Sequence, residues 1–526
     1  MVRVLQTVAG LTCYLNQCRQ SPLNGWAEPL TVGLVPTMGN LHQGHRSLID
    51  RARQDNDLVV VSIFVNPTQF AQGEDLATYP RTPEADLAIC EQAGVDVMFT
   101  PSVAQLYGTA EVEGEAITRV VPPAAMLMVL CGPHRPGHFQ GVATVVTKLI
   151  TLVRPDRTYL GRKDAQQVAI LKQVARDLHL PGQLVDCPTI RETSGLALSS
   201  RNHYLSEVQR QQATVIYRGL ERARSQFQAG EWQAVALIGA VREELATVPA
   251  IAPQYVELVH PHSLAPLAQV ETMGLLAVAA HLGTTRLIDN LLLRQRQPIV
   301  AIDGPAGAGK STVARQVAQR LGLLYLDSGA MYRAIAWRVL DQGIDPRDAV
   351  AVAELIPNCQ LRLAPTGDDP TWAAYPSRLW LNDQEVTALI RQPAVTALVS
   401  TIAAQPAVRQ VLLLQQQNYG IQGGVVMEGR DIGTQVFPQA ELKVFLTASA
   451  TERARRRQRD LQAQGQPAET LEALEQAIAE RDRKDSTRRV APLKRAPDAL
   501  ELNTDGLSIA AVVDQIVAWF QARVER

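Results

Sequence analysis

The sequence has 526 residues, and its 51 lysines and arginines nearly balance its 52 aspartates and glutamates, which gives a formal net charge of −1. One soluble domain usually takes about 100–200 residues, so this length predicts more than one domain. Apolar residues make up 46% and charged residues 20%, which excludes a mainly disordered chain. The near balance of charge argues against a chain whose main role is to coat nucleic acid or an anionic membrane.

The cysteines and the apolar runs predict a soluble cytoplasmic protein with neither a nucleic-acid nor a membrane partner. The six cysteines have no regular spacing and form no C-x-x-C pair, as is usual in a reducing compartment. They are Cys13, Cys18, Cys90, Cys131, Cys187 and Cys359. The apolar runs are shorter than the roughly 18–20 residues needed to cross a bilayer, and the N-terminus lacks the long uncharged stretch of a signal peptide.

Strand-like and helix-like segments alternate over residues 1–190. Runs rich in Val, Ile and Leu lie between amphipathic stretches, which is typical of a parallel sheet covered by helices on both faces. The expected strands are 31–36, 57–65, 95–99, 158–160 and 183–187, and the expected helices are 43–56, 83–93, 141–153 and 164–179. We therefore expect a doubly wound, Rossmann-like α/β domain here.

The pattern changes after residue 190 and again at Pro298. A helical stretch over 205–247 precedes three strand-like runs with short connections, which predicts a small α+β subdomain over 191–293. The three runs are 255–260, 275–282 and 285–293. A new α/β pattern follows directly after the junction RQRQ at 294–297, which is no long flexible tether. The predicted domains are therefore 1–293 and 298–526.

A phosphate-binding loop opens the second domain. GPAGAGKS fits G-x-x-x-x-G-K-[ST] at every fixed position, between an expected strand at 298–303 and an expected helix at 310–321. Glycines let backbone N–H groups point at phosphate oxygens, while Lys310 reaches the β- and γ-phosphates and Ser311 ligates Mg²⁺. The expected ATP contacts are Gly304, Gly307, Gly309, Lys310, Ser311 and Thr312. A chance glycine-rich turn is the alternative, and the flanking strand and helix disfavour it.

Three further polar segments accompany this loop: LDSGAMYR at 326–333, EGRDIGT at 428–434 and ERDRKDSTRR at 480–489. A phosphoryl-transfer transition state carries excess negative charge, which cationic segments of this kind offset. With these segments, residues 298–526 resemble the bacterial cytidylate kinase family of nucleoside monophosphate kinases. The resemblance implies a P-loop α/β kinase domain that phosphorylates CMP and dCMP with ATP.

The same resemblance implies roles for individual residues and segments. It makes Lys310 catalytic, with an insert that binds CMP at about 345–395 and a lid at about 449–489. The implied CMP contacts are Ser328, Arg333, Ser400, Arg409, Arg430, Asp431 and Asp485, and the implied lid arginines are Arg481 and Arg488. Phosphoryl transfer to the acceptor phosphate proceeds in line, without a covalent nucleophile. UMP is the alternative acceptor, and a solvated helix pair is the alternative interpretation of the charged lid segment.

Two histidines mark a candidate nucleotide site in the first domain. PTMGNLHQGH spans residues 36–45, after an expected strand and before an expected helix. His42 and His45 are three residues apart and so share a face near the start of that helix, where an α-phosphate would meet imidazole donors and the helix dipole. Two core histidines are the first alternative. A metal site is a weaker one, because no third ligand is evident nearby.

Four other polar loops suggest a site for a triphosphate and a small acid. They are VNPTQF at 65–70, HRPGHFQGV at 134–142, GRKDAQQ at 161–167 and ALSSRN at 197–202. In combination with the histidines, these motifs make about 1–290 resemble the pantothenate synthetase (pantoate–β-alanine ligase) family of the H-x-G-H nucleotidylyltransferase superfamily. The resemblance implies two steps: pantoate and ATP give pantoyl adenylate and pyrophosphate, and β-alanine then gives pantothenate and AMP.

The implied residues follow this family's motifs. His42, His45, Lys163 and Arg201 would be catalytic, with His45 the proton donor. The ATP contacts would be Met38, Gly39, His42, His45, Gly161, Lys163, Asp164, Ile190, Leu198, Ser199, Ser200 and Arg201, and the pantoate and β-alanine contacts Asn66, Gln69, Arg135 and Gln167. Arg162 departs from the acidic or amide residue that the family often has there, and it adds positive charge beside Lys163.

Together the two resemblances predict a bifunctional enzyme, an arrangement found in cyanobacteria. They imply Mg²⁺ with ATP at both sites, no tightly bound organic cofactor, and a homodimer through the first domain. One alternative is that the first domain takes a different hydroxy acid. Another is that one half is a catalytically inactive nucleotide-binding module, against which the intact His42, His45, Lys163, Lys310 and Ser311 argue. Substrate channelling is not expected, because the two reactions share no intermediate.

Overall fold

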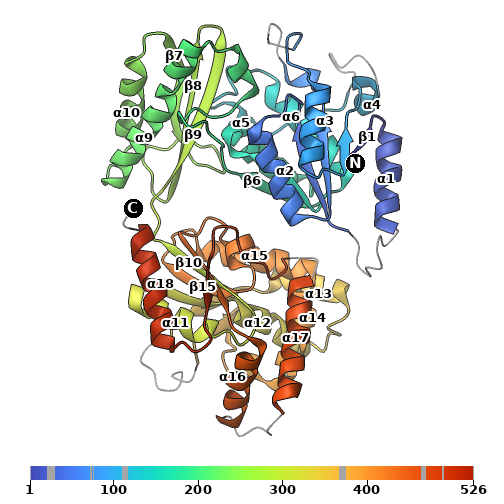
Figure 1. Ribbon diagram of the computed structural model, residues 1–526, viewed down its shortest axis with the longest axis vertical. Helices are drawn as coiled ribbons and strands as arrows, with labels where there is room; N and C mark the ends of the chain where they lie inside the picture. The colour runs from blue at the N-terminus through green and yellow to red at the C-terminus, as the bar shows by residue number, and fades with distance from the viewer. Residues whose placement is uncertain are drawn as a thin grey trace. The chain divides into compact units, whose positions relative to one another are not determined.

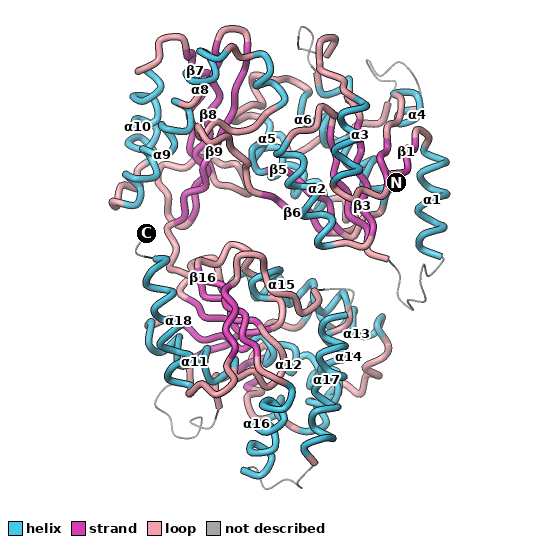
Figure 2. Tube along the Cα trace, viewed as in Figure 1, coloured by secondary structure: helices cyan, strands magenta, loops and turns pink. Residues whose placement is uncertain are grey.

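Parallel sheets organise both of the units into which the chain divides, Met1–Gln295 and Arg296–Arg526 (Figure 1). The computed structural model describes residues 2–20, 30–70, 74, 76–108, 117–366, 375–463, 470–487 and 491–524. Figure 2 shows strands and helices alternating along most of both units.

The first unit contains a six-stranded parallel sheet with strand order β1-β4-β3-β2-β5-β6. Its strands are β1 (Arg3–Leu5), β2 (Val32–Thr37), β3 (Leu58–Ile63), β4 (Val97–Phe99), β5 (Arg157–Gly161) and β6 (Gln183–Cys187). Its helices are α1 (Val8–Gln20), α2 (Gln43–Asp55), α3 (Pro83–Gln92), α4 (Val103–Tyr107), α5 (Ala124–Leu127), α6 (His138–Val153) and α7 (Ala165–Asp177). Every strand and helix predicted for residues 1–190 is present with slightly shifted ends, whereas β1, α1, α4 and α5 were not predicted.

Successive residues of the central strand pack on opposite faces of this sheet. Leu34 belongs to a cluster with α1 and α6, and the next residue, Val35, to a cluster with α2 and α3. Both faces are therefore covered, which explains why β3 begins with a continuous Leu-Val-Val-Val run rather than an alternating pattern. The predicted Rossmann-like fold class is confirmed.

The rest of the first unit is an α+β subdomain. Its antiparallel sheet contains β7 (Ile251–Val259), β8 (Met273–Leu282) and β9 (Thr285–Arg294), and its helices include α8 (Glu207–Ala213), α9 (Val215–Gln228) and α10 (Ala234–Ala246). One face of the sheet packs on α9 and α10, and the other packs on α6 and α7. The expectation of short connections is wrong between β7 and β8, because the intervening segment 260–272 folds back to pair Pro266 with Val259.

The second unit contains a five-stranded parallel sheet with strand order β11-β15-β10-β16-β17. Its strands are β10 (Ile299–Asp303), β11 (Leu324–Asp327), β15 (Val425–Gly429), β16 (Leu442–Thr447) and β17 (Leu500–Asn503). Its longer helices are α11 (Lys310–Leu321), α12 (Ser328–Asp341), α14 (Pro393–Ala403), α15 (Pro406–Tyr419), α16 (Ala450–Ala463), α17 (Leu471–Thr487) and α18 (Ile509–Val524). Helices α11 and α18 cover one face, while α12, α14 and α15 belong to the core on the other.

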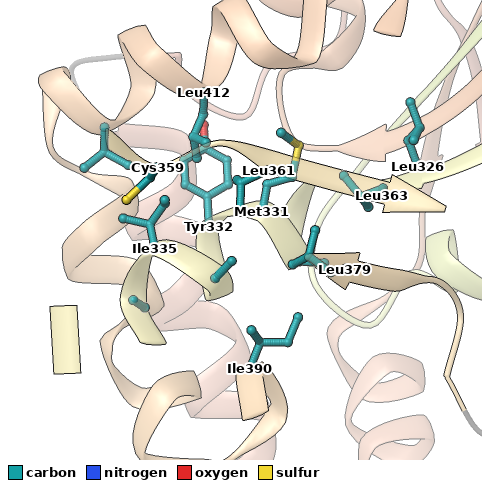
Figure 3. Packing of buried hydrophobic residues seen from close by; sticks show 14 of the residues in the cluster. Leu326, Met331, Tyr332, Ile335, Cys359, Leu361, Leu363, Leu379, Ile390 and Leu412 are labelled. Atoms are coloured by element: carbon teal, nitrogen blue, oxygen red, sulfur yellow. The ribbon is translucent and has the colours of Figure 1, made fainter. Parts of the chain in front are cut away.

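The segment predicted as an insert carries a small antiparallel sheet of β12 (Leu361–Ala364), β13 (Arg378–Leu381) and β14 (Gln384–Glu385), after α13 (Ala349–Leu355). Its leucines alternate inward and meet α12, as Leu361, Leu363 and Leu379 do around Met331 and Tyr332 (Figure 3). The insert is thus built onto the core of the second unit.

Helices α16 and α17 form a highly charged pair with a small apolar contact of Ala454, Leu461 and Leu474. Among the described residues, no single helix is long and apolar enough to cross a membrane; only α14 and α15 taken together meet that measure, across a bend of 97°. All six cysteines are free thiols.

Candidate active sites

The two histidines of the first unit lie where β2 gives way to α2. His42 is the residue that precedes α2, and its Nδ1 accepts a hydrogen bond from the Gly44 backbone at 3.1 Å. The Nδ1 of His45 accepts one from the His42 backbone at 3.3 Å. The rings are 4.2 Å apart, centre to centre. Because both Nδ1 atoms accept, both neutral imidazoles carry their proton on Nε2 and can donate it to a ligand.

Burial keeps both histidines uncharged at neutral pH. It lowers the pKa of His42 to about 4, with Lys163 adding to the effect. It lowers the pKa of His45 to about 3, with His42 and Lys163 adding to it. Because the charge of Lys163 lowers both pKa values, two motifs more than a hundred residues apart in sequence come close together here.

A buried aspartate shapes the loop before the histidines. The carboxylate of Asp86, on α3, accepts hydrogen bonds from the backbone N–H groups of Asn40 at 3.0 Å and Leu41 at 2.7 Å. Gly39 has a φ of +85°, and a Cβ there would lie 2.9 Å from Ile63, so the turn requires glycine. Asp86 was not predicted, because an aspartate in the first turn of a helix usually just complements the helix dipole.

Lys163 and Asp164 follow β5, which pairs with β2 in the sheet. The chain leaves β2 toward β3 on one side and later returns to β5 on the other, and ligands of open α/β sheets bind at such a reversal. Burial alone would raise the pKa of Asp164, but Lys163, His138 and Arg201 outweigh it and lower that pKa. The side chains that shift the pKa of Asp164 therefore lie close to it.

The segment 190–202, which includes Arg201, folds back on itself close to Asp164. The Leu198 backbone donates to the Ile190 carbonyl at 3.0 Å, and the Ser199 hydroxyl accepts from the Arg201 backbone at 3.3 Å. The hydroxyl of Ser200 lies 3.4 Å from that of Tyr79. The predicted phosphate loop is thus a short, internally bonded turn.

Asn66 and Gln69, two of the predicted pantoate residues, contact each other. Asn66 is only 1% exposed, and its side chain bonds to Gln69, to the Gly141 carbonyl at 3.2 Å and to the Tyr107 hydroxyl at 2.8 Å. It therefore does not have the open amide that the sequence suggested; it orients Gln69, whose Nε2 lies 2.7 Å from the Met38 sulfur.

Arg135, another predicted pantoate residue, contacts His138. Arg135 makes a bidentate ion pair with Glu74 at 2.8 and 2.6 Å. Arg135 also lies 3.0 Å from Nε2 of His138, whose Nδ1 lies 2.7 Å from the Gln69 carbonyl. A guanidinium only donates and a carbonyl only accepts, so His138 is neutral with its proton on Nδ1. Burial, followed by the charge of Arg135, lowers its pKa to about 4.

A recess that is partly open to solvent lies beside these residues. Lys163, Asp164 and Gln167 line it from the parallel-sheet part. Residues of β8 and β9, such as Ala277 and Asn290, line it from the α+β subdomain. Both parts of the first unit therefore enclose the candidate site.

In the second unit, the glycine-rich loop lies between β10 and α11, as predicted. Gly304, Gly307 and Gly309 all have positive φ, and a Cβ on Gly304 would lie 2.1 Å from the Leu446 carbonyl. Lys310 is 7% exposed and donates through Nζ to the Pro305 carbonyl at 2.7 Å, so it curls over the loop. Ser311 and Thr312, in the first turn of α11, are exposed and half-buried respectively.

Two buried carboxylates lie behind this loop. Asp303 accepts from the Ile432 and Gly433 backbones at 2.8 and 2.7 Å, and burial raises its pKa to about 6. Glu428 accepts from the Tyr325 hydroxyl at 2.6 Å, and burial, then Asp327, raises its pKa. Burial lowers the pKa of Lys310. Neither carboxylate was predicted, although each stands at the end of a strand beside a glycine motif.

Several predicted acceptor residues pair with one another. Arg409 and Asp431 form a buried ion pair. Arg430 donates to Asp485 on α17 at 2.9 Å. The structure thus connects β15, α15 and the lid helix through charges that the sequence singled out separately.

Of the remaining predicted acceptor residues that the structure describes, Arg333 and Ser328 form polar contacts, whereas Ser400 does not. Arg333 pairs with Asp327 at 2.7 Å, and the Ser328 hydroxyl donates to the Glu428 carbonyl at 2.6 Å. Ser400 is exposed on α14, and within the part of the chain that the structure describes its hydroxyl makes no hydrogen bond. Arg488 lies outside the described residues.

One unpredicted arginine connects the helix pair to the phosphate loop. Arg453, on α16, is 6% exposed, donates to the Ala306 carbonyl at 3.2 Å and pairs with Asp482 on α17 at 2.6 Å. Arg481, nearby on α17, has its pKa lowered by burial and by Arg430. No group of three or more metal-ligating side chains is found in the described ranges.

Fold and site geometry place the first unit among H-x-G-H nucleotidylyltransferase-like enzymes and the second among P-loop nucleoside monophosphate kinases. The family model described as pantoate-beta-alanine ligase matches residues 3–292, and the model described as cytidylate kinase matches residues 300–522. The chain therefore belongs to the family of bifunctional pantoate ligase/cytidylate kinases.

Similar proteins share this organisation over their full length. A bifunctional pantoate ligase/cytidylate kinase of Trichormus variabilis is 56% identical over 537 residues, covering 100% of both chains. One of Synechocystis sp. is 54% identical and covers 99% of each. The crystal structure of pantothenate synthetase from Thermus thermophilus is 43% identical with a TM-score of 0.50, over 55% of this chain and 99% of that one.

Proposed function

We propose that the chain makes pantothenate from pantoate, β-alanine and ATP in its first unit and phosphorylates CMP and dCMP with ATP in its second. The observation that carries this proposal is the convergence of phosphate-directed groups after adjacent parallel strands in each unit. In the first they are His42, His45 and Lys163; in the second, Lys310 and Arg430. Membership of the bifunctional family supports both activities.

In the first reaction step, a pantoate carboxylate oxygen attacks the α-phosphorus of ATP and pyrophosphate leaves. Negative charge grows on the phosphate oxygens, and Lys163 and Arg201 offset it. His42 and His45 donate through Nε2–H as neutral imidazoles, since their lowered pKa values keep them uncharged at pH 7. His45 is the proposed proton donor, and it acts by donating a hydrogen bond to the leaving pyrophosphate. Asp164 holds Lys163 in place.

In the second step, the neutral amine of β-alanine attacks the acyl carbon of the adenylate. AMP leaves, and the amine loses a proton as the amide forms. Gln69 and Gln167 hold the pantoate hydroxyls, and Asn66 acts through Gln69. Arg135 and His138 close the pocket beside them. The adenylate is needed because a free carboxylate is a poor acyl donor.

In the second unit, an oxygen of the CMP phosphate attacks the γ-phosphorus of ATP in line, and ADP leaves. Lys310 and the loop backbone hold the β- and γ-phosphates. Arg333, Arg409 and Arg430 are the cations for the acceptor phosphate, and each is paired with a carboxylate in the free protein. Arg481 and Arg488 of the lid close over the phosphates and exclude water, which would otherwise compete as the acceptor.

Mg²⁺ accompanies ATP at both sites in this proposal. Ser311 suits it in the kinase, because its hydroxyl lies in the first turn of the helix after Lys310, within hydrogen-bonding reach of the Glu428 carboxylate, and offers the hard oxygen ligand that Mg²⁺ prefers. The ion would neutralise charge on the phosphate oxygens. No tightly bound organic cofactor is required by either reaction.

We also propose a homodimer through the first unit and a cytoplasmic location. The domains are 1–293, with the closing subdomain from 191, and 298–526, with the CMP-binding insert and the lid α16–α17. Light scattering of the purified chain tests the dimer, for which a mass near twice 57.4 kDa is expected. A mass near 57.4 kDa would refute it.

Product analysis on the full chain tests both activities at once. Pantoate with β-alanine and ATP should yield AMP and pyrophosphate, whereas CMP with ATP should yield ADP and CDP. Turnover of CMP, UMP and AMP compared side by side decides the acceptor, and pantoate compared with other hydroxy acids decides the first substrate. Absence of either product set would refute the corresponding half of the proposal.

A further inference from the structure

Two adjacent buried residues of β9, Asp289 and Asn290, contact the two phosphate-facing loops of the first unit. They are 5% and 7% exposed, and neither belongs to the motifs that define the site. We propose that this pair is a positioning element that fixes the Lys163 turn and the 190–201 loop relative to each other, and so sets the spacing between Lys163 and Arg201. This inference rests on the proposed ligase function.

Asn290 holds the Lys163 turn. Its Nδ2 donates to the Lys163 carbonyl at 2.8 Å and to the Arg162 carbonyl at 3.1 Å. One amide group thereby uses both of its hydrogens on two successive carbonyls, which fixes the direction in which the backbone enters α7. Lys163 is therefore anchored through its own main chain.

Asp289 holds the other loop. Its two carboxylate oxygens accept from the guanidinium of Arg191, at 2.5 Å and 2.9 Å. Arg191 also donates to the Gly195 carbonyl at 3.1 Å and lies over the Tyr217 ring at 4.0 Å. The backbone of Arg191 pairs with Ala197, two residues before Ser199. A planar, bidentate pair of this kind fixes orientation as well as distance.

Strand geometry explains how neighbours reach different loops. Successive side chains of a strand point to opposite faces of the sheet. Asp289 pairs with Val278, whose face packs on α9, and Asn290 pairs with Ala277, whose face packs on α6 and α7. The Asp289 carboxylate also accepts a hydrogen bond from the Asn290 backbone at 2.8 Å. The residue that holds the 190–201 loop is thus bonded to the residue that holds the Lys163 turn.

The choice of residues argues for positioning rather than for packing alone. Both faces of β8 at this point are otherwise built from Ala and Val, and apolar residues of similar size would be buried there without the desolvation cost of an amide and a carboxylate. Two oppositely directed polar side chains do what apolar ones cannot, because Asn290 fixes the direction of two backbone carbonyls and Asp289 fixes that of the Arg191 guanidinium. Those groups belong to the loops that carry Lys163 and Arg201.

The test uses the full chain with Asn290→Leu and Asp289→Asn, each close in size to the original residue. Each variant is expected to lower kcat for pantoate-dependent ATP–pyrophosphate exchange at least tenfold, while the KM for pantoate changes less than twofold. Because the two residues act as a unit, the double variant should lose no more than about the larger single loss. CMP phosphorylation, which the second unit carries out, should stay unchanged and reports that the second unit is intact. Urea unfolding followed by hydrogen exchange in α6 peptides reports whether the first unit is folded.

The control is Leu287→Ala, which removes a buried side chain from the same strand, on the face of Asp289, and leaves the polar side chains of Asp289 and Asn290 in place. Its kcat for exchange should stay within twofold of the wild type at a temperature below its unfolding midpoint. Equal losses in Leu287→Ala, or losses of the two polar variants that multiply, would overturn the inference. If Asn290→Leu does not fold, Asp289→Asn decides. A wild-type chain without exchange would overturn the proposed ligase function itself.

Discussion

His138 gives the first unit a stability that acid should remove. Its Nδ1–H donates to the Gln69 carbonyl and its Nε2 accepts from Arg135, so the folded pocket holds only the neutral ring. Burial and then Arg135 lower its pKa from 6.5 to about 4, although Glu74 and Asp164 act in the opposite direction. Between these two pH values the unfolded chain binds a proton that the folded chain does not.

The sign and size of the effect follow from this difference. Stability is fully present above pH 6.5 and is lost as the pH falls from 6.5 toward about 4. A difference of this size corresponds to about 3 kcal/mol, since each pKa unit is worth about 1.4 kcal/mol. His138→Gln should remove this dependence, because a glutamine amide can donate to the Gln69 carbonyl and accept from Arg135 without titrating.

The assay is urea unfolding of the full chain at pH values from 7.5 to 4, read by hydrogen exchange in peptides from α6. The wild type should lose about 3 kcal/mol more than His138→Gln over this range. His42 and His45 titrate in both proteins and so cancel from the comparison. Equal pH dependence in the two proteins would refute the assignment of a buried neutral His138.

Three further predictions concern single residues. Lys310→Ala should lower CMP phosphorylation at least a hundredfold, or about 2.7 kcal/mol, and leave pantothenate formation intact; unchanged ADP production would contradict the phosphate-loop role. His45→Ala should do the reverse, lowering pyrophosphate release from ATP and pantoate by a similar factor, and full adenylate formation would count against it. Asp303 has a folded pKa raised to about 6 from 3.8, so the folded second unit binds the proton more tightly and should gain stability as the pH falls from above 6 toward 3.8. Asp303→Asn should abolish this gain, about 3 kcal/mol, measured by urea unfolding with exchange in α11 peptides; a wild type without the gain would contradict it.

Periodicity predicted the elements whose burial is regular. The strand DLVVVSIFV was expected from its apolar run, and β3 indeed has five fully buried residues in a row. By contrast, β1 has only three residues and two of them are exposed, so no apolar pattern marks it. Strand β14 has two residues, too few for any periodicity. Short or exposed elements take their structure from the neighbour they pair with, which the local sequence does not contain.

The site divides in the same way. Gly309 and Lys310 were predicted because the chemistry needs them at a fixed spacing within one loop. Asn290 and Lys163 lie 127 positions apart, and their contact exists only after both parts of the first unit have folded. Nothing in the run TRLIDNLLL distinguishes its polar pair from ordinary interruptions of a strand. Asn66 is the opposite case: a motif predicted that it contacts substrate, but the side chain is buried and orients Gln69 instead.

In the second unit, carboxylates lie against the arginines that would bind phosphate. Arginines that await a phosphate would repel one another in the free protein: burial lowers the pKa of Arg481, and the neighbouring charge of Arg430 lowers it further. Resident carboxylates relieve this repulsion: Asp485 holds Arg430, and Asp431 holds Arg409. A phosphate that binds these arginines must compete with those carboxylates, so part of its attraction is spent on separating existing pairs. These local pairs hold the phosphate-directed arginines before substrate binds, and their carboxylates offset part of the positive charge in the near-neutral total.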